Sequence, residues 1–396
     1  MTTIAISHCD DYGLEKVSAA TKRCLSLIGN IETIVRPGMK VLLKLNLLSA
    51  SLGPERAVNT HPTIIRALVN IFQEDYGCEV YIGDSCGSLR TGSTDKAFRV
   101  TQIDKIAEDT GAIIVNFDKD EALDITNKNA VILKDFKIAK TVKSVDVVVN
   151  VPKLKTHGLT RYTGAIKNMF GSIPANGKKN VHLLAPKNRS MAQALVDVFE
   201  MVQPQITVMD AVVGMEGNGP NAGDPRKVGL IIAGFDGVAL DAVASTIIGF
   251  DPMKVPIIKY AHERKLGTAD MNKIDVSGED ICKVAVSDFK KPSSSAQDFA
   301  SNYIPDFLLA KMFDNSCSSV SSVYEPNCTR CYECIRNCPA KAMSAPDGRV
   351  IVDEDKCIGC FCCDEVCNYK AIVMKRTFLG RAFLKMAVFL GVERLQ

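Results

Sequence analysis

Runs of valine, isoleucine and leucine alternate with amphipathic stretches along roughly the first 290 residues of the chain. The apolar runs, which predict buried strands, are 40–47, 79–85, 112–117, 145–152, 205–213 and 227–234. The amphipathic stretches, which predict helices, are 61–77, 94–111 and 238–249. Continuous apolar strands that alternate with helices indicate an α/β fold, in which a largely parallel sheet carries helices on both faces.

The pattern changes after residue 286, and four regions are predicted. Residues 1–286 form the α/β domain, and residues 287–323 form a serine-rich linker with one short helix. Residues 324–374 form a small cysteine-rich α+β module, and residues 375–396 form a basic amphipathic helix at the C-terminus. This last helix is expected to pack on its own domain or on a partner, with contact to a membrane surface as the alternative.

The composition is that of an ordinary globular protein, with 46% hydrophobic residues and a net charge of +3. No export signal and no apolar stretch of membrane-spanning length is apparent, which favours a cytoplasmic protein. Nine of the 15 cysteines fall between residues 328 and 367. Their close spacing favours reduced thiols that bind metal over disulfides.

The cysteine-rich module is an internal repeat with an offset of 29 residues, because "CTRCYECIRNCP" at 328–339 returns as "CIGCFCCDEVCN" at 357–368. The spacing C-x2-C-x2-C-x3-C is that of two-cluster bacterial ferredoxins, in which the fourth cysteine of each run serves the other cluster. The first predicted [4Fe–4S] cluster is bound by Cys328, Cys331, Cys334 and Cys367. The second is bound by Cys357, Cys360, Cys363 and Cys338. Zinc is the rival ligand for paired C-x2-C motifs.

Two residues depart from the repeat. Cys362 is an additional thiol, which we interpret as a small buried side chain without a ligand role. Asn368 stands where the first run has Pro339, so one cluster edge loses a rigid apolar residue.

A second signal lies in the α/β domain, where no aspartate or glutamate occurs between Val147 and Val196. The overall content of 45 acidic residues in 396 predicts about six in a window of this length. Ligands of open α/β sheets bind beyond the carboxyl ends of the strands, and cationic side chains there suit an anion.

We therefore predict a binding site for an anionic small molecule at these strand ends. The predicted binding residues are Lys153, Lys155, Lys167, Asn46 and Glu216. His157 and Lys155 are the candidate catalytic residues, with the histidine as the group that moves a proton. The alternative is a loop that presents a solvated basic face. Nucleic acid is disfavoured, because no known binding module is present.

Three segments carry a family resemblance: "NVPKLKTHGLTRYTGAIKNMFGSIP", "GMEGNGPNAGDPR" and "THPTIIRAL" followed by "YIGDS". They resemble the hallmark segments of domain-of-unknown-function family 362 (DUF362), which is often joined to bacterial-type ferredoxin modules. The resemblance covers roughly residues 35–255 together with the cysteine repeat. It implies an iron–sulfur redox protein of anaerobic metabolism and no particular reaction.

These features together predict a ferredoxin-linked oxidoreductase that passes electrons from two clusters to an anionic substrate. A ferredoxin or another redox protein is the expected partner, and the presence of a flavin or a further metal is left open. The alternative is a non-catalytic electron-transfer or assembly protein whose α/β domain docks a partner.

Overall fold

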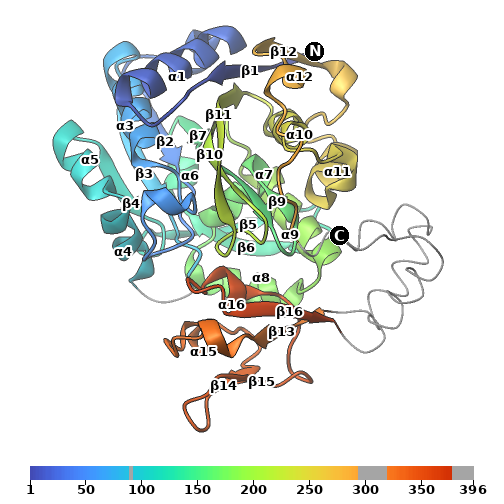
Figure 1. Ribbon diagram of the computed structural model, residues 1–396. Coiled ribbons are helices and arrows are strands. Elements are labelled where there is room, and N and C mark those ends of the chain that lie inside the picture. Colours follow the sequence, from blue (N-terminus) through green and yellow to red (C-terminus); the bar gives the residue numbers. More distant parts are fainter. Residues whose placement is uncertain (89–91, 293–318, 377–396) are drawn as a thin grey trace.

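A computed structural model describes residues 1–88, 92–292 and 319–376 (Figure 1). These residues form an α/β domain and a smaller unit, residues 319–376, which we call the cysteine module. Most of the predicted linker and residues 377–396 of the predicted C-terminal helix lie outside the described residues.

A ten-stranded mixed sheet is the centre of the α/β domain. Its main path runs in the order β12-β1-β11-β10-β7-β2-β3-β4, and β8 and β9 extend it beside β10. The strands are β1 Thr2–His8, β2 Lys40–Lys44, β3 Glu79–Asp84, β4 Ile113–Asn116, β7 Val147–Asn150, β8 Lys153–His157, β9 Arg161–Thr163, β10 Ile206–Glu216, β11 Asp224–Gly234 and β12 Ile274–Gly278. The pairings from β10 through β7, β2 and β3 to β4 are parallel, whereas β11 is antiparallel to both neighbours. The predicted largely parallel α/β sheet is thus confirmed, with an antiparallel portion around β11.

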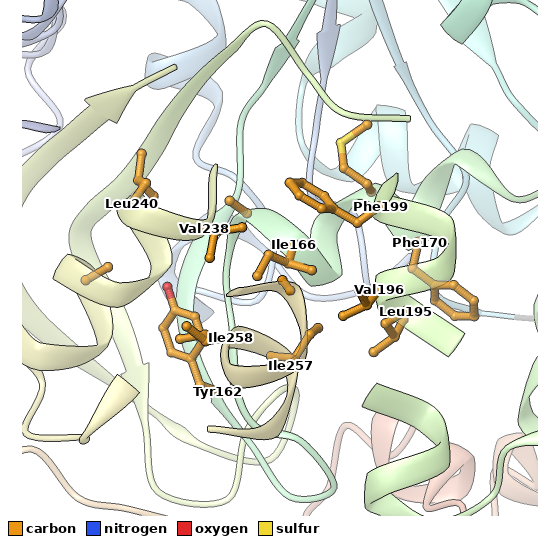
Figure 2. Close-up of a cluster of buried hydrophobic side chains, with 14 of the residues drawn as sticks. Tyr162, Ile166, Phe170, Leu195, Val196, Phe199, Val238, Leu240, Ile257 and Ile258 are labelled. Atoms are coloured by element: carbon orange, nitrogen blue, oxygen red, sulfur yellow. The ribbon is translucent and has the colours of Figure 1, made fainter. Parts of the chain in front are cut away.

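Helices cover both faces of this sheet (Figure 1). One face packs against α1 Leu14–Ile28, α3 Pro62–Asn70, α4 Ser93–Val100 and α5 Ile103–Thr110. The other packs against α7 Ala165–Asn168, α9 Asn188–Met201, α10 Gly237–Ile247 and α11 Pro256–Glu263. Figure 2 shows the second core, where Phe199, Ile166 and Val238 meet between these helices. Because both faces are covered, the central strands are apolar on both sides, which explains their uninterrupted valine and leucine runs.

The remaining elements of the α/β domain are short. They are α2 Ile31–Ile34, α6 Thr141–Ser144, α8 Ala175–Leu184, α12 Ile281–Val284 and the hairpin of β5 Ala122–Thr126 with β6 Asp135–Ala139. Short helical turns span Pro54–Arg56, Ile71–Asp75, Met169–Ser172, Pro252–Lys254 and Met271–Lys273. Within the described residues, none of the helices has the length and apolar character needed to cross a bilayer.

Two local predictions are wrong. The helix expected over 94–111 is divided into α4 and α5, because Gln102 adopts a left-handed conformation (φ 56°) between them. The segment Lys153–His157, expected as a loop, is the fully buried strand β8, which pairs with β10 and β9. Lysines usually lie on the surface, which is why the sequence suggested a loop. Inside the domain, an ion pair and hydrogen bonds provide partners for the amines of Lys153 and Lys155.

The cysteine module contains two small antiparallel sheets and two helical turns. Its elements are β13 Ser319–Val323, α15 Glu333–Arg336, β14 Met343–Ser344, β15 Ile351–Val352, α16 Cys362–Glu365, β16 Ile372–Arg376 and a short turn at Glu325–Asn327. β13 pairs with β16, and β14 pairs with β15. The end of the predicted linker therefore belongs to the module as β13. The module lies below the α/β domain in Figure 1, with α16 next to α8.

Candidate functional site: a lysine-lined cavity beside the cysteine module

A buried ion pair lies where the parallel strands β2 and β3 end. Nζ of Lys44 is 2.8 Å from Oδ1 of Asp84, and both side chains are almost fully buried. Backbone N–H groups of Leu47 and Ser85 also donate to the Asp84 carboxylate. A Cβ on Gly171 would lie 2.4 Å from Asp84 Oδ1, so only glycine leaves room for the pair there.

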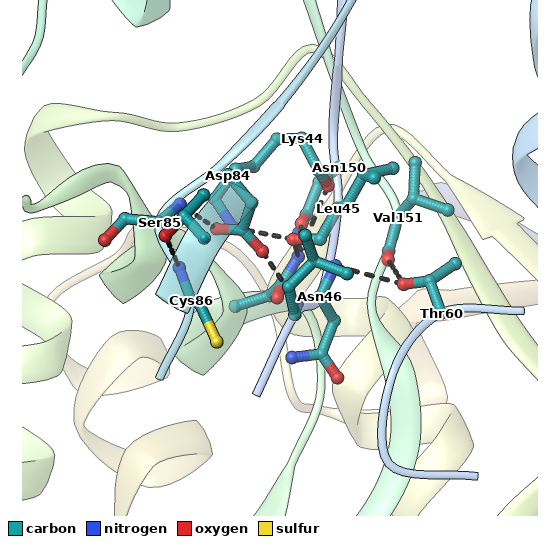
Figure 3. A network of polar contacts seen from close by, with 12 residues as sticks. Lys44, Leu45, Asn46, Thr60, Asp84, Ser85, Cys86, Asn150 and Val151 are labelled. Atoms are coloured by element: carbon teal, nitrogen blue, oxygen red, sulfur yellow. Dashed lines mark hydrogen bonds and ion pairs between the residues drawn. The ribbon is translucent and has the colours of Figure 1, made fainter. Parts of the chain in front are cut away.

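Amide and hydroxyl groups fix the neighbouring strand ends. Nδ2 of Asn168 donates to Oδ1 of Asn150 at 2.7 Å and to the carbonyl of Leu45 at 3.0 Å. Thr60 donates to the carbonyl of Val151 and accepts from the backbone of Asn46 (Figure 3). Oδ1 of Asn46 is buried and has no hydrogen-bond partner among the described residues, which leaves it available to a ligand.

These strand ends open into a cavity of about 60 Å³. Its charged walls are four lysines and two carboxylates: Lys44, Lys155, Lys167, Lys178, Asp84 and Glu365. Other lining groups include Asn46, Ser85, Thr163, Asn168, Phe170 and His182. Four ammonium groups against two carboxylates give a formal excess of two positive charges. A water molecule needs about 10–15 Å³ of such space, so the cavity has room for about four to six water-sized groups.

Lys155 is the most strongly perturbed lysine of the cavity. Burial lowers its pKa well below the ordinary value, and the nearby charges of Lys167 and Lys153 lower it further. Its amine donates to the carbonyl of Val58 at 2.8 Å. Because an anion beside this amine would favour its charged form, the protonation of Lys155 is coupled to ligand binding.

The helix α8 contributes two side chains to the cavity. Lys178 is buried, donates to the carbonyls of Ser85 and Cys86, and has a pKa lowered by burial. The ring of His182 packs edge-on against Phe170, with 5.9 Å between ring centroids, and burial lowers its pKa to about 4. His182 is therefore a neutral imidazole at physiological pH.

The cysteine module supplies an acidic residue to this basic site. Oε1 of Glu365, in α16, lies 3.0 Å from Nε2 of His157. Burial alone would raise the pKa of Glu365, but Lys167, His157 and His182 outweigh it, and the pKa falls well below the usual range. The glutamate is therefore a carboxylate.

His157 faces this carboxylate as a neutral ring. Its Nδ1 accepts from the backbone N–H groups of Leu159 and Thr160, which places the imidazole proton on Nε2, facing Glu365. Burial, followed by Lys167, lowers the pKa of His157 to about 4.

The predicted site residues fall into three groups. Asn46, Lys155 and Lys167 line the cavity together. His157 lies behind it, in contact with Glu365, and is not a lining residue. Lys153 and Glu216 lie outside the cavity. The alternative of a solvated basic face is wrong, because Lys153, Lys155 and His157 are each 1% exposed.

Lys153 and Glu216 make other contacts. Nζ of Lys153 lies 2.8 Å from the Asp210 carboxylate and 2.7 Å from the hydroxyl of Tyr12. Glu216, at the end of β10, accepts from the backbone N–H of Lys290. Neither residue lines the cavity.

The cysteines gather in the two predicted quartets. Cys338, Cys357, Cys360 and Cys363 line one small pocket of the module. In the other quartet, burial and then the thiols of Cys367, Cys331 and Cys328 raise the pKa of Cys334 to about 11. All cysteines of the described residues are free. Cys338 therefore lies beside the second run and Cys367 beside the first, and these clustered thiols suit metal binding, whereas the two [4Fe–4S] centres stay a prediction.

Asn368 joins the module to the α/β domain. Its Nδ2 donates to Oγ of Ser51 at 2.7 Å, and its Oδ1 accepts from Nδ2 of Asn221 at 3.2 Å. Lys370, two residues further on, pairs with Asp224 at 2.5 Å. A proline at position 368 would make neither amide contact, so the departure from the repeat coincides with a domain interface.

The sequence did not single out Glu365, His182 or Lys178 as site residues. Lys178 and His182 lie in the acid-free window, but only the fold brings them to the strand ends. Glu365 has a weak signal, since it is an acid between two cysteines predicted as ligands in "CCDEVC".

One curated relative is a thylakoid-associated protein of Synechocystis sp., which is 31% identical over 279 residues, 67% of this chain and 79% of its own length. Among solved structures, the lactate racemase apoprotein of Thermoanaerobacterium thermosaccharolyticum matches with a TM-score of 0.39 at 12% identity, over 59% of this chain and 54% of its own. A Thermotoga maritima protein matches with a TM-score of 0.35 at 14% identity, over 58% and 57% of the two chains. The chain thus spans little more than half the length of these structures.

The family described as "Domain of unknown function (DUF362)" matches residues 41–246, which contain the strand ends and most of the residues that line the cavity. The expected resemblance of the α/β domain is therefore confirmed, and the chain belongs to the DUF362 family.

Proposed function

We propose that this protein is an iron–sulfur oxidoreductase that reduces a small anionic molecule in the lysine-lined cavity. The observation that carries the proposal is the position of Glu365, which belongs to the cysteine module and also lines the cavity of the α/β domain. The predicted electron carrier and the predicted substrate site are therefore adjacent, because one residue of the module lines the cavity.

The binding of the anion follows from the charges and the size of the cavity. Lys44 and Asp84 largely neutralise each other, whereas Lys155, Lys167 and Lys178 are the lysines that remain for a ligand, beside Glu365. Asn46 offers an amide whose Oδ1 has no partner in the described part of the chain. A ligand of about four to six non-hydrogen atoms, such as a small carboxylate or an oxyanion, suits the volume.

Two [4Fe–4S] clusters, bound by the two cysteine quartets, would supply electrons singly from a ferredoxin or another redox protein. Lys155 would bind the anion and deliver a proton to it, because its pKa is lowered and it lines the cavity. His157 would hold Glu365 in position through its Nε2 proton, a different role from the predicted proton transfer.

The alternative function is electron transfer or assembly without chemistry in the α/β domain, which would then dock a partner protein. Thermal denaturation of the anaerobically purified protein with a panel of small carboxylates and oxyanions separates the two functions. The oxidoreductase requires at least one anion to raise the melting temperature and to reoxidise the reduced clusters. If no anion does so, and Lys155→Ala leaves electron transfer to a partner unchanged, the non-catalytic function is correct.

The cluster assignment has an independent test. Anaerobic protein is expected to carry about eight iron atoms per chain. A preparation that contains zinc and no iron would contradict the assignment. The cytoplasmic location stays a prediction, and the name of the Synechocystis relative favours testing membrane fractions as well.

A further inference from the structure

Three metal-binding side chains converge at the boundary between the cysteine module and the cavity. The ligand atoms of His182, Cys360 and Cys362 all lie within 4.8 Å of one another, and all three residues are buried. His182 comes from α8 of the α/β domain, whereas the two cysteines come from the second cysteine run of the module.

The separation of the two sulfurs fits a shared metal ion. Sγ of Cys360 and Sγ of Cys362 are 3.6 Å apart. Two thiolates at 2.3 Å from a tetrahedral metal are about 3.8 Å apart. The same distance permits a weak S–H···S hydrogen bond, so the sulfur pair alone does not identify a ligand.

His182 supplies the second, independent observation. It is 6% exposed, and its Nδ1 is a buried nitrogen without a hydrogen-bond partner among the described residues. Buried polar nitrogens are rarely left without a partner, and a metal ion is one way to satisfy them. Phe170 packs edge-on against the ring, which limits its orientation.

We propose that Cys360, Cys362 and His182 bind one divalent metal ion of the zinc, cobalt or nickel class. Thiolate and imidazole ligands select such metals over magnesium or calcium. Three protein ligands leave a fourth position open, the arrangement of catalytic rather than structural zinc sites. Because His182 also lines the lysine-lined cavity, a bound anion could occupy that position.

Cys360 has a double role in this arrangement. It lines the small pocket of the second cysteine quartet, whereas Cys362 does not. The Cys360 thiolate would therefore bridge the proposed ion and the second cluster. This bridging part rests on the cluster assignment of the proposed function, but the three-residue metal site does not.

The test is cobalt binding to the whole anaerobic protein, read by metal analysis, visible absorption and X-ray absorption at the cobalt edge. The wild type is expected to bind about one cobalt ion per chain with two sulfur ligands and one nitrogen ligand, beside about eight iron atoms. Cys362→Ser and His182→Gln should each weaken cobalt binding at least tenfold and leave the iron content unchanged. Cys282→Ser, at an exposed cysteine outside the module, is the matched control and should bind cobalt like the wild type.

The outcomes separate the two proposals. Wild-type protein with eight iron atoms and no cobalt would overturn the additional metal site and leave the clusters standing. Cobalt binding that survives both substitutions would also overturn it. Cobalt bound by the three residues in protein without iron would support the metal site and contradict the cluster assignment. Because His182 lies outside the module, His182→Gln tests the site even if Cys362→Ser disturbs the cysteine run.

Discussion

Nε2 of His157 lies 3.0 Å from Oε1 of Glu365, and this contact joins a strand of the α/β domain to the cysteine module inside the protein. His157 is 1% exposed, so the contact is shielded from solvent. Two backbone N–H groups donate to Nδ1 of the histidine, and the charge of Lys167 stabilises the glutamate as a carboxylate. The Glu365 carboxylate is therefore one of the contacts that hold the two units together, beside those of Asn368 and Lys370.

Glu365→Ala is expected to destabilise the protein. It leaves Lys167 and the Nε2 proton of His157 without their carboxylate, and removing one partner of a buried charged contact costs about 3 kcal/mol. Glu365→Gln should cost less, because its amide oxygen still accepts from His157. Melting temperatures measure both effects. Glu354→Ala, at an exposed acid of the same module, is the control, and an equal loss in the control would refute a special role for Glu365.

Stability is expected to fall as the pH drops below about 6.5. The unfolded chain protonates His157 near pH 6.5, whereas burial and Lys167 hold the pKa of the folded state at about 4, despite the attraction of Glu365. Between these values the unfolded state binds more protons, so acid favours unfolding. From pH 7.5 to 5.5 this one residue contributes a loss of about 1 kcal/mol.

Thermal melts of wild type and His157→Gln over that pH range measure this contribution. The variant is expected to be less stable at every pH but to lose less stability on acidification. His8→Gln, at an exposed histidine, should keep the wild-type pH dependence. Identical slopes in wild type and His157→Gln would contradict the predicted contribution.

Lys155→Met is expected to abolish anion binding without unfolding the protein. Methionine keeps most of the side-chain volume and removes a buried amine whose desolvation is costly, which offsets the lost hydrogen bond to Val58. Calorimetric titration with phosphate, sulfate and small carboxylates should show at least a tenfold loss of affinity. In the wild type, binding should take up protons, because a bound anion raises the lowered pKa of Lys155, so affinity falls as pH rises.

Repeating the titration in buffers with different heats of ionisation measures this proton uptake. Lys137→Met, at an exposed lysine, is the control and should bind anions as the wild type does. Equal binding by Lys155→Met and the wild type would remove Lys155 from the site.

Asp84→Ala is expected to destabilise the α/β domain by about 3 kcal/mol or more, because it leaves Lys44 as an unpaired charge in the interior. The double variant Asp84→Leu with Lys44→Met should recover much of that loss, since no charge then remains buried. Gly171→Ala is a second test of the same ion pair. Its methyl group would displace both charged groups, so it is also expected to destabilise the domain. Chemical denaturation of these variants, and of Asp84→Leu and Lys44→Met alone, gives the comparison. Losses in the double variant equal to the sum of the two single losses would contradict the coupling.

The strand pattern and the cysteine spacing could be read from the sequence because each depends on local periodicity. Buried parallel strands require apolar residues on both sides, and the 29-residue repeat aligns its ligands directly. Acid-free composition around Lys155 likewise indicated the strand ends that form the cavity.

Pairings between distant residues could not be read in the same way. β8 carries Lys153 and Lys155 and looks like a surface loop in the sequence. Its burial is feasible because these lysines contact Asp210, the Tyr12 hydroxyl and the carbonyl of Val58. Similarly, nothing near His182 indicates that it meets Cys360 and Cys362, which are about 180 residues away in the sequence. Such contacts are set by the packing of the module on the domain.

The last prediction concerns Asn368, whose amide contacts Ser51 and Asn221 across the domain interface. Asn368→Pro copies the first cysteine run, where Pro339 follows Cys338, so the backbone of the module should tolerate it and the iron content should stay unchanged. The two interdomain hydrogen bonds would be lost, at a cost of about 1 kcal/mol each.

Amide hydrogen exchange around Ser51 and in the neighbourhood of Asn221 measures the weaker contact, and both regions are expected to exchange faster in the variant. Asn368→Ala removes the same hydrogen bonds without a proline and should give the same result, whereas Tyr369→Phe, at the neighbouring half-exposed residue, should not. If exchange stays at the wild-type rate in both Asn368 variants, the asparagine does not hold the module on the domain. If only the proline variant exchanges faster, the change in backbone, and not the lost amide, is responsible.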